Sequence, residues 1–499
     1  MSFAGWEVEE KLLAKQWEID CIDITLTQNA TPNPHQYRGK GHLRQEADGV
    51  VTFRLYLPND YIKESQIELG SSNDAGMLVP RDAYYTLAAT DWYARVWTCN
   101  RVHPDISTTD AGGRLSSVIS GKATYLQTTE DIPELDWYAV RLVWLGTFDI
   151  PANCATETVK TVGNRNPIRS WSRNVALFKN DLGEFVIRAE PGRLVLTCES
   201  SQAQHPNFVE RIAEALGFVV GRRLPWNYSE EYRDKSRITR ARTQEQSDEL
   251  ALPVPAGGVS RDHAGYTWVI FSRFLQFIAS HEGNERPPVS RHIYGVLQGY
   301  QGTIGAYALS LGIAVEGLCT DLFPPSVEYD TRFRRWVKDL KKHCLAWGSF
   351  SDPEAYAALY DRVGGMIGTL HSTRPKDTLH RLASAGAVKA ELAAAWGKLR
   401  NATAHANIKA TGTLQELVTL CDQVVVLLYQ LVFKAIGYEG IYTDYSQRGY
   451  PEKRYRGRPV TKEELAVAAY FLWLAEGKKD GNDLAHWYKA RSMLEAGLI

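Results

Sequence analysis

One segment of the sequence combines residue types that can act on a phosphodiester. Arg400, Asn401 and His405 lie close together within residues 392–408, after an Ala- and Leu-rich run that predicts a helix. Arginine presents a fixed fork of N–H donors to phosphate oxygens and can stabilise the charge that develops on them. Histidine titrates near neutral pH, so it can accept or release a proton during a reaction.

These groups are sufficient in principle to cleave RNA without a metal, because RNA carries its own nucleophile, the 2′-hydroxyl. His405 would carry out the proton transfers, which typically contribute about 10²–10⁴-fold to a rate. Arg400 would stabilise the phosphate in the transition state, and Asn401 could donate to the phosphate or fix the imidazole. The sequence therefore makes Arg400, Asn401 and His405 the candidate catalytic residues, with no metal ligand and no cofactor.

The spacing of these residues limits what one helix can do. Asn401 and His405 are four residues apart, so on a regular helix they share a face. Arg400 and His405 are five apart and diverge by about 140°. One helix alone therefore gathers the three side chains poorly.

The segment resembles the signature of the HEPN superfamily, in which an Arg, a polar residue that is often Asn, and a His a few positions later lie late in a helical bundle. Two other Arg–His pairs, Arg286–His292 and Arg374–His380, have similar spacing, but prolines interrupt both. The resemblance implies an all-α bundle, metal-independent endoribonuclease activity, and a homodimer or higher oligomer in which two copies of the motif face one cleft. Two Arg and two His would then separate the general base from the general acid.

Further residues are weaker candidates. Similar HEPN bundles often place an acidic residue of an earlier helix near the motif, which implies that Glu316 holds Arg400 or orients His405. Thr403, inside the motif, is a second supporting candidate. RNA contacts are predicted for Lys398 and for three arginines of a basic run, although such runs are more often solvated faces. Those arginines are Arg332, Arg334 and Arg335.

Composition restricts the class of protein. The chain has 499 residues, of which 44% are hydrophobic and 23% charged, and its net charge of −1 provides no global attraction for nucleic acid. The seven cysteines form no C-x-x-C pair, which argues against a disulfide framework or zinc site and favours a reducing cytoplasm. The acidic N-terminal segment is unlike a signal peptide, and residues 414–436 carry polar side chains typical of a core helix. We therefore expect a cytoplasmic protein without a membrane partner.

Periodicity predicts an α+β multidomain chain. Val51, Phe53, Leu55 and Leu57 alternate as in a half-buried strand. Capping boxes at 351–354, 413–416 and 461–464 predict helix starts. We expect a β-rich sensor or regulatory domain, a sandwich or barrel-like fold, followed by a basic connector, a helical bundle, a linker and a two-helix domain. The corresponding residues are 1–218, 219–260, 261–440, 441–459 and 460–499.

Two further resemblances complete the expectation. The C-terminal segment, with Trp473 before Gly481 and Trp487 after it, resembles a small bacterial two-helix domain of unknown function. The order of a β-rich half before a HEPN bundle is similar to that of ApeA-type anti-phage proteins. This implies a toxin-like RNase effector in abortive infection, activated by a phage-derived trigger. The alternative is a non-catalytic HEPN scaffold, a dimer in which Arg400 binds a nucleotide or RNA phosphate and His405 is structural.

Overall fold

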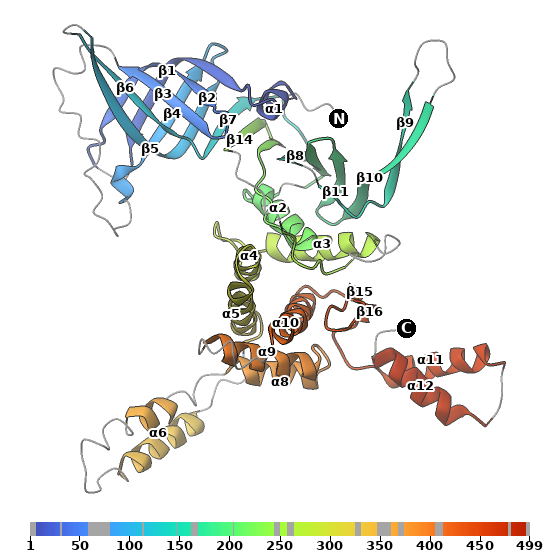
Figure 1. The fold of residues 1–499 in the computed structure, drawn as a ribbon. Coiled ribbons are helices and arrows are strands. Elements are labelled where there is room, and N and C mark those ends of the chain that lie inside the picture. Colours follow the sequence, from blue (N-terminus) through green and yellow to red (C-terminus); the bar gives the residue numbers. More distant parts are fainter. Residues whose placement is uncertain are drawn as a thin grey trace. The chain divides into compact units, whose positions relative to one another are not determined.

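The computed structural model divides the chain into two compact units, residues 1–249 and 250–499. The described residues are 6–29, 32–57, 80–111, 114–146, 148–160, 168–202, 204–243, 250–256, 264–324, 331–346, 361–367, 374–404, 413–477 and 481–495. The expected mixture of a β-rich N-terminal region with helices after it is confirmed (Figure 1).

Six strands of the first unit close into a barrel. Their order is β4-β1-β2-β3-β6-β5, and β5 pairs back with β4. The strand β4 lies beside β1 after the run β1–β2–β3, which is a Greek-key arrangement. Alternating burial along β3 points Val51, Phe53, Leu55 and Leu57 into the core, as the sequence predicted. The barrel strands are β1 (Glu18–Gln28), β2 (Gln36–Gln45), β3 (Val51–Leu57), β4 (Tyr85–Asp91), β5 (Val96–Ala111) and β6 (Arg114–Lys122).

The sheet continues beyond the barrel through β7, in the order β7-β14-β13-β8-β12-β11-β10-β9. All the strand pairings of this sheet are antiparallel. These strands are β7 (Tyr125–Asp131), β8 (Tyr138–Leu145), β9 (Cys154–Lys160), β10 (Ile168–Asn180), β11 (Gly183–Glu190), β12 (Arg193–Ser200), β13 (Tyr228–Arg233) and β14 (Ser236–Arg242). A 3₁₀ turn, η2 (Arg81–Ala83), and the helices α1 (Trp6–Leu13) and α2 (Phe208–Val220) complete the described elements of this unit.

The interpretation of residues 219–260 as a basic connector is wrong for its central part, which forms β13 and β14 inside the sheet. Its arginines serve ion pairs rather than a solvated surface. Arg233 and Arg240 both donate to Glu231, at 2.7 and 2.8 Å, and only 1% of Glu231 is exposed. Arg237 pairs with Glu130 of the neighbouring strand β7. A basic stretch can thus be a pair of strands whose cations pair with carboxylates of the same sheet.

A second buried acid connects α1 to this sheet. Glu9 of α1 is 2% exposed and accepts hydrogen bonds from Arg141 of β8 and Arg193 of β12. Burying an unpaired carboxylate is costly, so these two guanidinium groups are what allows Glu9 to lie inside.

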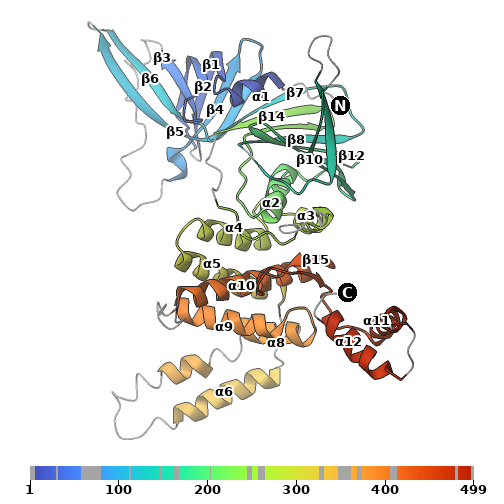
Figure 2. The same cartoon turned by 45° about the vertical axis from the view of Figure 1, so that its right-hand side comes forward.

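The second unit is mainly helical, and α10 passes through its core (Figure 2). The stripe of Leu417, Cys421, Val424 and Val425 is buried, and the capping box of Thr413 with Glu416 starts the helix as predicted. Among the described residues, α10 is the helix long and apolar enough to cross a membrane, but 67% of its apolar window is buried, as in a core helix. The helices are α3 (Ala264–Ala279), α4 (Pro288–Tyr300), α5 (Ile304–Leu322), α6 (Thr331–Ala346), α8 (Pro375–Ser384), α9 (Ala390–Ala404) and α10 (Leu414–Ala435).

The C-terminal part of this unit differs from a simple linker and hairpin. Residues 441–459, expected to be a linker, contribute to a two-stranded sheet of β15 (Gly440–Thr443) and β16 (Glu452–Tyr455). The capping box of Thr461 with Glu464 then starts α11 (Lys462–Ala475), which packs with α12 (Asp483–Glu495). Trp487 packs on their small core as expected, whereas Trp473 lies 5.7 Å from the ring of Tyr470. The expected capping box at 351–354 lies outside the described residues.

Candidate functional site

The position of α9 depends on a close approach to α5. The indole Nε1 of Trp396 donates to the carbonyl oxygen of Gly312 at 3.1 Å, in a buried hydrogen bond. A Cβ at Gly312 would lie 3.9 Å from Thr403 Oγ1 and 4.0 Å from Arg400 Cα, which is ordinary van der Waals distance and shows that α5 and α9 are in contact here. Since residues four apart on a helix share a face, Glu316 is brought to the same contact one turn after Gly312.

This contact brings Glu316 and Arg400 together. Arg400 Nε donates to Glu316 Oε2 at 3.0 Å, and Nη2 makes a longer contact of 3.5 Å with Oε1. The hydrogen bond with Glu316 raises the pKa of Arg400. The two side chains are 45% and 40% exposed. Because a guanidinium has five N–H donors and two face Glu316, three donors of Arg400 are left for a phosphate that approaches from solvent.

The other motif residues divide by orientation. Asn401 and Lys398 are exposed, so both can meet a ligand. The hydroxyl of Thr403 donates back to its own helix, to the carbonyl oxygen of Leu399 at 3.0 Å, which makes it a poor candidate for a supporting role in chemistry. The described part of α9 ends at Ala404, and His405 lies outside the described residues.

The candidate RNA-binding arginines lie on a separate helix. Arg332, Arg334 and Arg335 belong to α6 and are all exposed, as is Trp336, at 57%. Three lysines continue the basic character along the helix: Lys338, Lys341 and Lys342. The arrangement suits contact with a polyanion, and it is equally what a solvated helix face looks like.

His292 is a histidine that the sequence did not predict as a site residue. His292 Nε2 lies 2.8 Å from Asp321 Oδ2, which joins α4 to α5. The ring packs against Gly317, where a Cβ would lie 2.0 Å from His292 Cε1. Pro287 and Pro288 had argued against a helical motif here, but Pro288 is the first residue of α4, a position where proline needs no N–H partner. The helix start at Pro288 was the signal that could have identified His292.

Two polar pairs therefore lie against neighbouring turns of α5: Glu316 with Arg400 and Asp321 with His292. In the part of the chain that the structure describes, no group of three or more His, Cys, Asp or Glu side chains could hold a metal ion. The two carboxylates are five residues apart and so point in different directions from α5, which makes these two separate pairs and leaves Arg400 with Glu316 as the candidate site.

Comparison with known proteins identifies one segment. Residues 461–496 match the family described as "Protein of unknown function (DUF2934)". They contain both helices of the C-terminal hairpin, in agreement with the resemblance seen in the sequence. No curated protein and no solved structure matches the chain. The C-terminal helical hairpin is thus the part of this chain that is similar to a described family, and that family's function is itself unknown.

Proposed function

We propose that this protein is a metal-independent endoribonuclease of the HEPN type. The observation that carries the proposal is the half-exposed guanidinium of Arg400, which Glu316 holds beside the exposed Asn401. The helix that presents this pair leads in sequence to His405.

Each residue has a role in the proposed reaction. His405 takes the proton from the 2′-hydroxyl, and a second imidazole protonates the leaving 5′-oxygen. Arg400 uses its remaining donors to stabilise the negative charge on the phosphate, and Asn401 adds a hydrogen bond. Glu316 is a positioning residue, because it orients the guanidinium without contacting the phosphate. The products are a 2′,3′-cyclic phosphate and a 5′-hydroxyl.

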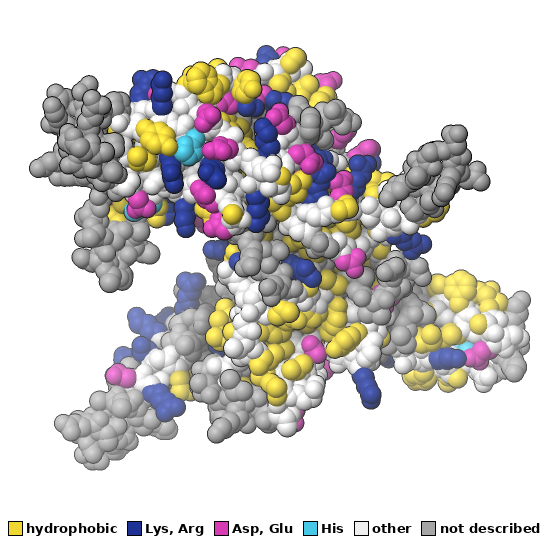
Figure 3. Space-filling view, turned by 45° about the horizontal axis from the view of Figure 1, so that its top comes forward, with side chains coloured by type: hydrophobic (Ala, Val, Ile, Leu, Met, Phe, Trp, Pro, Cys, Tyr) yellow, Lys and Arg dark blue, Asp and Glu magenta, His cyan; other side chains and the backbone are white. Residues whose placement is uncertain are grey.

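The surface beside the site supports dimerisation. Leu309 and Ile313 of α5 are 44% and 58% exposed and lie on the helix face that continues to Glu316. Hydrophobic side chains gather on the face of the helical unit that Figure 3 displays. A two-fold contact across this part of α5 would place two Arg400 side chains near one cleft, as the proposed reaction requires.

We assign the β-rich unit the role of sensing a phage-derived trigger in a cytoplasmic defence response. Charges of both signs are interspersed over the face of this unit in Figure 3, which is unlike a nucleic-acid-binding surface and suits a protein or small ligand. This role rests on the similarity to ApeA-type proteins.

The test is RNA cleavage by the intact protein in excess chelator. Arg400→Ala and His405→Ala are expected to lose cleavage. Arg374→Ala and His380→Ala are matched controls, because they alter an exposed Arg–His pair of similar spacing, the N-cap residue and an internal residue of α8, and should cleave normally. Equal activity of the wild type and His405→Ala would refute the proposal.

The non-catalytic scaffold predicts a different result with the same proteins. Wild type and His405→Ala would both bind RNA and leave it intact, while Arg400→Ala would bind it more weakly. The ion pair between Glu316 and Arg400 is compatible with this alternative, so only the cleavage measurement separates the two.

A further inference from the structure

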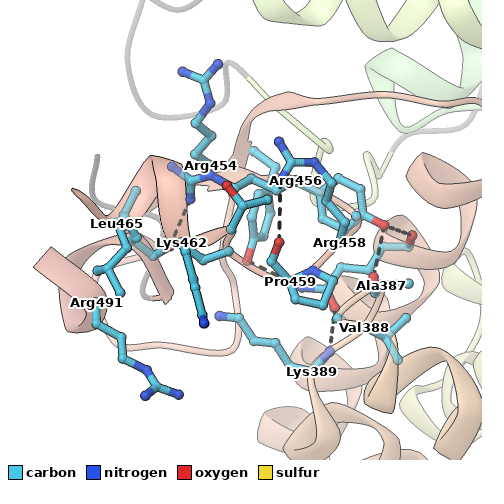
Figure 4. Close-up of a pocket in the computed structure, with 18 of the residues that line it drawn as sticks. Ala387, Val388, Lys389, Arg454, Arg456, Arg458, Pro459, Lys462, Leu465 and Arg491 are labelled. Carbon is cyan, nitrogen blue, oxygen red and sulfur yellow. Dashed lines mark hydrogen bonds between the residues drawn. The ribbon is translucent and has the colours of Figure 1, made fainter. Parts of the chain in front are cut away.

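A cavity of about 510 Å³ lies in the second unit, next to the C-terminal hairpin. Most of its lining comes from three segments: residues 386–389 before α9, residues 454–462 from β16 to the start of α11, and side chains of the hairpin. Gln430 of α10 and Tyr442 of β15 complete the lining. Figure 4 shows Lys389, Arg456 and Arg491 reaching it from these three segments. Its volume lies within the usual range of small-molecule sites, about 300–1,000 Å³.

The charge of the lining is one-sided. Six basic residues and no acidic residue line the cavity: Lys389, Arg454, Arg456, Arg458, Lys462 and Arg491. Carboxylates outside the lining offset part of this charge. Lys389 pairs with Asp444 at 3.1 Å, and Arg458 pairs with Glu464 at 2.8 Å and with Glu439 at 3.9 Å. The side chains that line the cavity are nonetheless charged with one sign, which favours an anionic ligand.

The neighbouring cations affect Arg456 directly. Burial lowers its pKa, and the guanidinium groups of Arg454 and Arg458 lower it further against the opposing effect of Glu464. Its Nη1 donates to the carbonyl oxygen of Leu494 at 2.8 Å, which joins the linker to the last turn of α12. A half-buried cation beside other cations is stabilised when an anion enters, because the anion restores the charge balance lost on burial.

The start of α11 faces the same cavity. Thr461 is its N-cap and Lys462 its first residue, and both line the cavity. This helix end is already capped, because Thr461 and Glu464 exchange hydrogen bonds there, so Lys462 is the group that α11 offers to an anion. Trp487 of α12, half-buried in the lining, presents an aromatic ring on which a base can stack.

We propose that this cavity binds a nucleotide, with its phosphates held by Arg456 and Lys462 and its base against Trp487. Because the cavity joins residues before α9 to the hairpin, the bound nucleotide fastens the hairpin to the bundle. The proposal does not depend on the ribonuclease activity, since none of its residues belongs to the Arg400 site.

The test is calorimetric titration of the intact protein with ATP and with tripolyphosphate. Both are expected to bind, more weakly as salt increases, and ATP more tightly because of its base. Lys462→Met and Arg456→Met should each weaken binding about tenfold or more, as expected for loss of a charged hydrogen-bond donor. Trp487→Leu should remove the advantage of ATP over tripolyphosphate.

Controls separate binding from folding. Arg456 also holds Leu494, so its variant could loosen the hairpin, whereas Lys462 is exposed and starts α11. Lys489→Met removes a cation of the same hairpin that pairs with Glu476 and does not line the cavity, and it should bind normally. Arg400→Ala should also bind normally, which makes failure of this proposal distinguishable from failure of the ribonuclease proposal.

Three outcomes would overturn the proposal. The wild type could bind neither compound, or Lys489→Met could weaken ATP binding as much as Lys462→Met does. In the third outcome, single-stranded RNA displaces ATP and binds more tightly than ATP when the two are compared at equal phosphate concentration. The last outcome would assign the cavity to RNA.

Discussion

The ion pair of Arg400 with Glu316 should matter little for stability and greatly for activity. Both side chains are about half exposed, and their shortest N–O distance is 3.0 Å. Exposed pairs contribute about 0.2–1 kcal/mol, because water screens the charges and two long side chains lose freedom. A double-mutant cycle with Arg400→Gln and Glu316→Gln should therefore give a coupling energy in that range. For a unit of this size, the melting temperature should shift by a few degrees at most.

The effect on cleavage is expected to be much larger. Loss of a donor that stabilises the charged transition state costs on the order of 10²–10³-fold in rate, or about 3–4 kcal/mol. Arg400→Gln should lose that much cleavage while unfolding almost normally. Glu316→Gln should lose less, about tenfold, because Arg400 keeps its charge and loses only its orientation. Arg400→Lys should also be poor, since an ammonium cannot reproduce the fork of donors.

The measurements are thermal unfolding by circular dichroism and initial rates of cleavage of a labelled RNA in chelator, normalised to folded protein. The reasoning is refuted if Arg400→Gln destabilises the protein by several kcal/mol and retains its rate per folded molecule. That result would make Arg400 a structural residue.

Three further outcomes are expected. Gly317→Ala should destabilise the helical unit by about 1–3 kcal/mol in urea unfolding, because the new Cβ meets His292 at 2.0 Å; an unchanged midpoint would contradict the packing described. Glu9→Gln should cost about 1–3 kcal/mol, since Arg141 loses a buried charged partner while Arg193 keeps Glu10 and Glu190, and a neutral effect would show that Glu9 is not buried in solution. Burial raises the pKa of Asp422 to about 6. As the pH rises from about 4 to about 6, Asp422 therefore loses its proton in the unfolded chain before it does so in the folded protein, and the folded state becomes less stable. Asp422→Asn should therefore stabilise the protein at pH 7 and have little effect near pH 4, and a stabilisation that is equal at both pH values would contradict this assignment.

The elements with strong periodicity could be predicted from the sequence. The alternation of Val51, Phe53, Leu55 and Leu57 gives β3 at the expected residues, and Thr413 with Glu416 gives the start of α10. These signals are local, because they depend on burial of one face or on the amides of one turn.

Partners distant in sequence decided the cases in which prediction failed. The arginines of residues 233–242 indicated a connector, because the sequence does not show that Glu231 is buried or that Arg237 pairs with Glu130, 107 residues earlier. The barrel likewise depends on the pairing of β1 with β4 and of β3 with β6, strands that lie far apart in sequence.

At the site, the sequence identified Arg400 and Glu316 but could not show their contact. That contact depends on the packing of α9 against α5, where Trp396 donates to the backbone carbonyl oxygen of Gly312, and neither residue type carries a chemical signature. His292 was missed because the prolines before it were interpreted as helix breakers, although one of them starts α4.

The central claim, that the RNA's own 2′-hydroxyl is the nucleophile, is tested most directly by the ends of the cleavage products. The protein would be incubated in excess chelator with an RNA and with the same sequence carrying 2′-O-methyl groups. The account predicts cleavage of the RNA alone, with 2′,3′-cyclic phosphate and 5′-hydroxyl ends. Cleavage of the 2′-O-methyl strand, or 5′-phosphate ends on the RNA products, would contradict it.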